Sequence, residues 1–203
     1  MVNWLHPYTG GGDRPDPLKG ALAGAAGGFV GSLRMGRLTT VWNKFNGRLE
    51  KSDNPHLKPA VSSRGVPDDE DRDPLPSYGD RVQAQAERDT ADAAVRAATG
   101  REPDRQETAI GGEVVHHMTG VLAGAVYGIA CEYSPQLRKA KGLPLGVGTF
   151  LLGREGGQWL TGLSQRPDKQ ATADHLVGLG SHLAYGFFTE LTRSSLRKAL
   201  ADD

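Results

Sequence analysis

Four apolar stretches, separated by polar segments, organise this chain. Two of them carry no Asp, Glu, Lys or Arg, and a third is apolar except for a central Arg-Glu pair. A helix needs about 20 predominantly apolar residues, with a range of roughly 17–25, to cross a membrane. All four are predicted to be helical, so the chain is expected to be all-α. The stretches are residues 19–33, 114–131, 143–164 and 175–189.

The polar segments complete the predicted organisation. Residues 50–79 are rich in Pro and acids, and cannot bury enough apolar surface to order themselves. Residues 80–98 contain strong helix formers with a weak apolar face, which predicts an amphipathic surface helix. The expected order is an irregular leader over 1–18, a first helix over 19–48, a polar, partly disordered loop over 49–107 carrying the surface helix, and a remainder over 108–200 with helices at about 110–133, 143–164 and 173–199.

A sixteen-residue pattern, H-x2-G-x6-Y-G-x3-E, occurs twice in the chain. Five identities at identical spacing are unlikely by chance. Because each helical residue turns about 100°, positions +3, +7, +11 and +15 from the His fall near 300°, 340°, 20° and 60°. One face of each helix would carry a His at one end, small residues in the middle and a carboxylate at the other end. The copies run from His117 to Glu132 and from His175 to Glu190.

Glycine recurs at every fourth position in the first and second helices. In a water-exposed helix each Gly costs about 0.8–1.0 kcal/mol relative to Ala, whereas in lipid small residues let helix backbones approach and associate. The pattern favours a four-helix membrane-embedded bundle with a glycine zipper. A soluble helical bundle binding an apolar ligand stays open, because the mean hydropathy of the chain is negative. The predicted packing residues are Gly20, Gly24, Gly28, Gly120, Gly124, Gly128, Gly178, Gly186, Tyr127 and Tyr185.

Composition excludes several classes of function. The chain has 24 basic and 24 acidic residues, so no global basic field indicates nucleic-acid binding. Its single cysteine, Cys131, cannot form an intrachain disulfide and is expected to be a buried thiol. No secretory signal region is recognisable at the N-terminus. Because the nucleophile-elbow, phosphate-loop and H-E-x-x-H patterns are all missing from the sequence, an enzyme is not expected.

The order of motifs from Glu113 onward resembles a known family. The run begins with His117, Tyr127-Gly128 and Glu132. It continues with Gly142-Leu-Pro-Leu-Gly146 and Glu155, and it ends with Gly162-Leu-Ser164, Pro167, His175, His182, Tyr185-Gly186, Glu190 and Arg193. This order is similar to the YagU-like family of small bacterial inner-membrane proteins, a domain of unknown function. The resemblance covers residues 95–200, and the first helix departs from it at Arg34-Met-Gly-Arg37. It implies a multi-pass protein of the bacterial inner (cell) membrane, loosely associated with acid tolerance.

Three histidines and three carboxylates are the candidate functional groups. Ionisable residues within a membrane bundle usually face its interior or a wet cavity, and histidine titrates near neutral pH. One hypothesis is an inward cluster that handles protons or small ions. Alternatively, neutral histidines donate interhelical hydrogen bonds that hold the bundle together, or histidines of the second and fourth helices ligate a haem or metal. The candidates are His117, His175, His182, Glu132, Glu155 and Glu190, and no cofactor or metal is predicted.

The sequence is therefore compatible with two functions from different classes. The first is proton or small-ion handling at the His/Glu cluster. The second is a structural or partner-binding membrane subunit without transport, with glycine rows as docking faces and residues 50–107 facing the partner. The expected partners are the lipid bilayer and either further copies of the chain or another membrane protein, and no nucleic acid. The short, basic segment 133–142 favours cytoplasmic termini.

Overall fold

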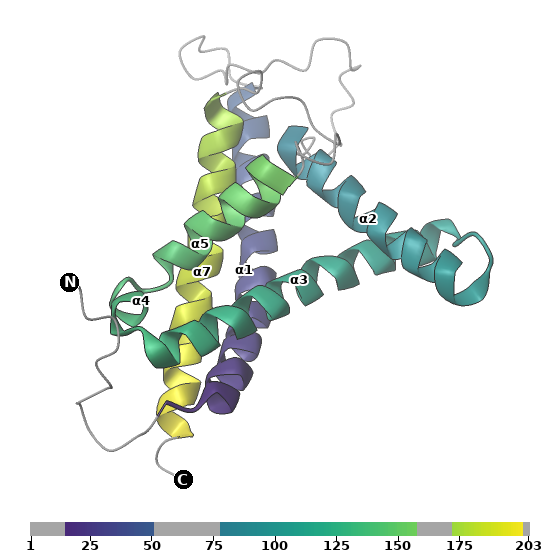
Figure 1. The fold of residues 1–203 in the computed structure, drawn as a ribbon. Coiled ribbons are helices and arrows are strands. Elements are labelled where there is room, and N and C mark those ends of the chain that lie inside the picture. The colour runs from purple at the N-terminus through teal and green to yellow at the C-terminus, as the bar shows by residue number, and fades with distance from the viewer. Residues whose placement is uncertain (1–14, 51–77, 158–171, 201–203) are drawn as a thin grey trace. The chain divides into compact units, whose positions relative to one another are not determined.

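Every secondary-structure element in the described part of the chain is a helix. The computed structural model describes residues 15–50, 78–157 and 172–200, so the all-α prediction is confirmed for these ranges (Figure 1). The elements are α1 (Pro17–Glu50), α2 (Tyr78–Thr99), α3 (Arg105–Tyr133), α4 (Pro135–Lys139), α5 (Leu143–Thr149), the π-helical η1 (Phe150–Gly157) and α7 (Thr172–Ala199).

The predicted helices fall on the observed ones with one difference. The ranges 19–48, 80–98, 110–133 and 173–199 lie within α1, α2, α3 and α7 respectively. The range 143–164 instead begins as the α-helix α5 and continues in π-helical geometry through η1. Residues 158–164 lie outside the described residues, as do 1–14 of the expected leader and 51–77 of the expected loop. The connection after Tyr133 contains the short helix α4.

Two compact units make up the chain. The first unit comprises Met1–Arg34, His116–Thr149 and Leu183–Asp203, and the second comprises Met35–Val115 and Phe150–His182. The first unit thus contains the beginning of α1, most of α3, all of α4 and α5, and the C-terminal part of α7. The second contains the rest of α1, all of α2, the first turns of α3 and α7, and η1.

Short side chains define where α1 and α3 begin. The Asp16 carboxylate accepts hydrogen bonds from the backbone N–H groups of Leu18 and Lys19, with Pro17 at the first helical position. At α3, Asp104 accepts from the backbone of Glu107, whose carboxylate accepts in return from the Asp104 N–H at 3.0 Å. This reciprocal arrangement is a capping box. Glu107 also binds Arg101 and raises the pKa of that guanidinium.

The glycine rows of α1 and α3 face each other in the first unit. A Cβ on Gly20 would lie 2.8 Å from the carbonyl oxygen of Gly128. A Cβ on Gly24 would overlap the carbonyl oxygen of Gly124, and a Cβ on Gly28 would overlap the carbonyl oxygen of Gly120. The residue numbers of the facing glycines rise along α1 and fall along α3, so the two helices are antiparallel. Side chains larger than hydrogen would force the two backbones apart at each of these positions.

Glycines also mediate the contacts of α7 within the first unit. On α1, a Cβ at Gly27 would overlap the carbonyl oxygen of Thr189, and one at Gly31 would lie 2.9 Å from the ring of Tyr185. On the other side, Gly142 at the start of α5 lies against the backbone of Gly186. Gly142 has a φ of 82°, a left-handed conformation that glycine adopts without strain. α7 therefore packs between α1 and α5.

In the second unit, α2 packs on the beginning of α3. A Cβ on Gly111 would lie 2.7 Å from the Cβ of Ala91, and one on Gly112 would lie 3.0 Å from the Cγ of Arg88. The Thr108 hydroxyl donates to the Asp92 carboxylate at 2.7 Å. Two glycines and one interhelical hydrogen bond thus fix α2 against α3.

Among the described side chains, the burial of large aliphatic groups is inverted relative to a water-soluble protein. Among the side chains that the structure describes, no Leu, Ile, Val or Met is buried, whereas Ser32, Glu132, His182, Thr189, Glu190 and Arg193 are. Soluble folds ordinarily bury their aliphatic side chains first. α3 is the described helix that is long and apolar enough to cross a membrane, and only 22% of its most apolar segment is buried.

Candidate functional site

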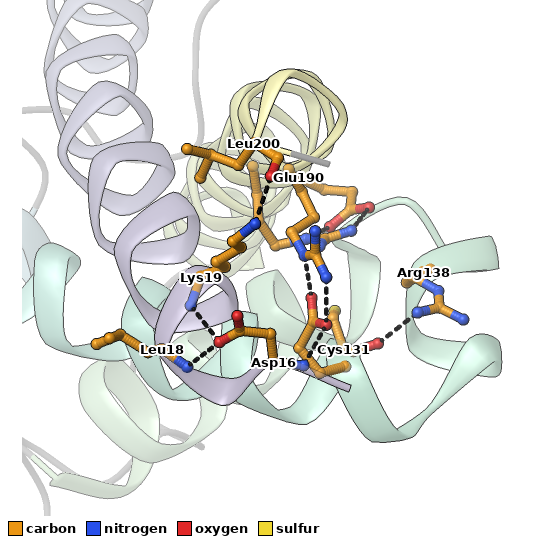
Figure 2. Close-up of polar contacts among 10 residues, drawn as sticks. Asp16, Leu18, Lys19, Cys131, Arg138, Glu190 and Leu200 are labelled. Carbon is orange, nitrogen blue, oxygen red and sulfur yellow. Dashed lines mark hydrogen bonds and ion pairs between the residues drawn. The ribbon is translucent and has the colours of Figure 1, made fainter. Parts of the chain in front are cut away.

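A buried carboxylate, Glu132, joins three elements at one end of the first unit. It stands at the end of α3 and accepts two hydrogen bonds from the Arg197 guanidinium of α7, from Nε at 2.9 Å and from Nη2 at 3.2 Å. Its Oε2 also accepts the backbone N–H of Asp16 at 3.1 Å, immediately before α1. The Glu132 side chain is 5% exposed and that of Arg197 is 14% exposed. This carboxylate therefore holds the start of α1, the end of α3 and the last turns of α7 together. Figure 2 shows the polar contacts of this region, with Asp16 before α1 and Leu200 after α7.

A second, more deeply buried ion pair lies one turn back along α7. Arg193 donates to both oxygens of Glu190, from Nε at 2.6 Å and from Nη2 at 2.7 Å. The exposed fractions of the two side chains are only 2% and 8%. A bidentate guanidinium–carboxylate pair is among the stronger charge-assisted interactions. The two charges cancel within one helix, in a place where an unpaired charge would be costly.

Three further contacts close the helix ends around these pairs. The Lys19 ammonium donates to the carbonyl oxygen of Leu200 at 2.6 Å, and Arg138 donates to that of Cys131 at 3.0 Å. Both cations satisfy carbonyl groups that a terminating helix leaves without an intrahelical partner. The Tyr127 hydroxyl donates to the carbonyl oxygen of Leu137 at 3.1 Å. Figure 2 shows the contact of Lys19 with Leu200 and that of Arg138 with Cys131.

His117 and Ser32 join α1 to α3 near the opposite end of the glycine contact. The Ser32 hydroxyl donates to the carbonyl oxygen of Phe29 at 2.8 Å, and its oxygen lies 2.8 Å from His117 Nδ1. Since a hydroxyl has one proton, both bonds form together only when Nδ1 carries a hydrogen and donates it. The His117 ring also meets the Phe29 ring edge-on, with centroids 5.6 Å apart. Tyr185 of α7 donates to the Gly120 carbonyl oxygen at 2.7 Å, one turn further along α3.

The other two candidate histidines belong to the second unit. His182 is buried, its Nδ1 lies 2.8 Å from the carbonyl oxygen of Gly178 one turn earlier, and its ring meets the Phe150 ring edge-on at 5.7 Å. His175 is half-buried on the same helix. His117 belongs to the first unit.

Structure and sequence differ in how the candidate residues are grouped. Glu132 and Glu190 lie in one unit with His117, but their closest polar partners are Arg197 and Arg193. The Glu155 side chain lies outside what the structure describes. Sequence reasoning overlooked Arg193, Arg197, Ser32 and Asp16 as polar partners. For Arg193 a signal existed, because Glu and Arg three positions apart share a helix face.

Metal ligation finds no support in the part of the chain that is described. Among the side chains that the structure describes, no three of His, Cys, Asp or Glu are placed so that they could share a metal ion. The single thiol, Cys131, is fully buried at the end of α3. Comparisons with protein-family models, with curated proteins and with solved structures found no match to this chain.

Proposed function

We propose that this chain is a multi-pass protein of a bacterial inner membrane that serves as a structural, partner-binding subunit rather than as a transporter. The inverted burial carries the proposal. Aliphatic and aromatic side chains of α1, α3, α5 and α7 are exposed, while glycines and paired polar groups occupy the helix contacts. Exposed apolar surface on this scale is unfavourable in water and favourable against lipid acyl chains. The outward residues of α3 include Val114, Met118, Leu122 and Val126, spaced four apart.

Two similar helix pairs support a four-helix arrangement within the membrane. Gly20 of α1 meets Gly128 of α3, and Gly142 of α5 meets Gly186 of α7. Gly128 and Gly186 are equivalent positions of the H-x2-G-x6-Y-G-x3-E pattern. Their partners, Gly20 and Gly142, are equivalent too. Each follows a lysine and precedes a second glycine by four residues, in Lys19-Gly20-x3-Gly24 and in Lys141-Gly142-x3-Gly146. Each pair would bring one helix across the membrane and another back, as in proteins built from parallel repeats.

The ion pairs favour a structural role over ion handling. A carboxylate that binds and releases ions must give up its protein partners each time, and leaving a buried charged partner behind is costly. Glu190 accepts two hydrogen bonds from Arg193, and Glu132 accepts two from Arg197 and one from the backbone of Asp16. Such contacts lock helix ends in place. The resemblance to the YagU-like family agrees with the proposed location.

Alkaline extraction combined with cysteine labelling tests this proposal. The chain is expected to stay in the membrane pellet after carbonate washing. In a Cys131→Ala background, Lys139→Cys and Lys198→Cys should react with an impermeant maleimide only after cell lysis, because α4 and the end of α7 would share the cytoplasmic side. Release into the supernatant, or labelling of one cysteine but not the other in intact cells, would contradict the proposed topology.

Proton handling remains a second candidate because of one observation, the hydrogen bond between Ser32 and His117. A half-buried imidazole in the contact between α1 and α3 is placed where a proton acceptor in a membrane would matter. In vesicles containing a pH-sensitive dye, this function predicts a proton flux that His117→Ala or His175→Ala abolishes. The structural proposal predicts no flux above that of empty vesicles for wild type and both variants.

A further inference from the structure

Positive charge collects at one end of the first unit although the whole chain is neutral. Apart from Arg34, all formally charged side chains described in this unit lie at the start of α1, the end of α3, α4, the start of α5 or the end of α7. Contacts from Asp16 to Glu132 and from Lys19 to Leu200 join these segments. Among the residues that the structure describes there, the cations outnumber the acids by seven to three: Lys19, Arg138, Lys139, Lys141, Arg193, Arg197 and Lys198 against Asp16, Glu132 and Glu190.

All three acids at this end are occupied within the protein. Glu132 binds Arg197, Glu190 binds Arg193, and Asp16 caps the first turn of α1. The excess charge therefore belongs to the remaining cations. Three of these, Lys139, Lys141 and Lys198, are exposed.

The exposed lysines lie close in sequence to exposed apolar side chains. Lys139 follows Tyr133 at the end of α3, Lys141 precedes Leu143 at the start of α5, and Lys198 follows Leu196 on α7. Tyr133 is 62% exposed, and Leu143 and Leu196 are also exposed. An apolar surface that ends in an aromatic residue and then lysines matches the boundary between acyl chains and headgroups.

We propose that Lys139, Lys141 and Lys198 bind the phosphate headgroups of anionic phospholipids. The inference rests on the proposed membrane location and adds a lipid class to it. Lysine suits this partner, since its long stem lies along apolar surface while its ammonium reaches the phosphate. Each lysine close to an anionic surface strengthens association roughly fivefold. Because the three lysines lie on two separate segments, α4–α5 and the end of α7, they fit a surface of many headgroups better than one small anion.

Spin-labelled lipids test this inference in reconstituted vesicles of the full chain. The measurement is the fraction of labelled phosphatidylglycerol, and separately of labelled phosphatidylcholine, whose motion the protein restricts. Wild type is expected to prefer phosphatidylglycerol, and Lys139→Gln/Lys141→Gln/Lys198→Gln to lose most of that preference. The charge-retaining triple Lys→Arg variant should keep it, as should the control Arg81→Gln/Arg88→Gln/Arg105→Gln, which removes three exposed cations from the second unit.

The possible outcomes separate this inference from the proposed function. If wild type restricts neither lipid, the protein is not embedded and the proposed function fails. If it restricts both lipids equally, or if the triple Gln variant keeps the wild-type preference, the membrane location stands and the headgroup site is refuted. Loss of the preference on adding inorganic phosphate, but not on adding chloride of equal ionic strength, would identify a free-phosphate site instead and overturn the lipid assignment.

Discussion

Replacing Arg193 with Met should destabilise the protein by about 3–5 kcal/mol, because it leaves the Glu190 carboxylate buried without its partner. The pair is bidentate, and both side chains are almost fully buried. Met has a similar length and no charge, so the change removes the ionic contact with little loss of volume. Chemical denaturation in detergent micelles, followed by circular dichroism, measures the difference in free energy of unfolding.

A double variant and an exposed pair provide the controls for this prediction. Glu190→Leu/Arg193→Met removes both charges and is expected to recover most of the lost stability, since apolar replacements of buried ion pairs are often neutral or stabilising. Arg96→Met breaks the exposed pair of Arg96 and Glu102, where the cost should not exceed about 1 kcal/mol. An Arg193→Met variant no less stable than Arg96→Met would mean that the buried pair contributes little.

The helices themselves could be predicted from the sequence because each depends on a local pattern. Long apolar segments and strong helix formers are properties of consecutive residues, and they locate α1, α2, α3 and α7 to within a few positions. The change to π-helical geometry in η1 was not predicted. A π-helix differs from an α-helix by hydrogen bonding one residue further along the chain, and composition alone does not distinguish the two.

Which helices meet, and in which register, depends on residues far apart in the sequence. The four-residue spacing puts Gly20, Gly24 and Gly28 on one face, but nothing in that spacing says that Gly24 meets Gly124. A second, shorter sequence repeat was overlooked because it too depends on which helices meet. Lys-Gly-x3-Gly occurs at residues 19–24 and 141–146, and it becomes informative only once Gly20 and Gly142 are seen to contact equivalent glycines.

The partners of the carboxylates could be predicted for one pair and not for the other. Glu190 and Arg193 are three residues apart on one helix, a spacing that brings side chains together. Glu132 and Arg197 lie on different helices, so their contact depends on how α3 and α7 pack. The hypothesis drawn from the sequence instead grouped the carboxylates with the three histidines.

Adding a single methyl group at Gly24 is expected to destabilise the contact between α1 and α3. A Cβ there would overlap the carbonyl oxygen of Gly124 and would lie 2.9 Å from the Cα of Gly128. Both neighbours are backbone atoms, so no side chain can move aside and the helices must separate. Overpacking of this kind typically costs 1–3 kcal/mol. Gly24→Ala should therefore lower the free energy of unfolding by about that amount in the same micelle assay.

Gly36→Ala is the matched control, because it makes the same change in the same helix with nothing within 4 Å of the new Cβ. Alanine favours a helix over glycine by about 0.8–1.0 kcal/mol, so this variant should be as stable as wild type or more stable. Gly124→Ala should resemble Gly24→Ala, and the double variant should cost less than the two single changes together, since the first methyl group already separates the backbones. If Gly24→Ala and Gly36→Ala stabilise the protein equally, the close approach of α1 and α3 contributes nothing to folding, and the glycines must be explained in another way.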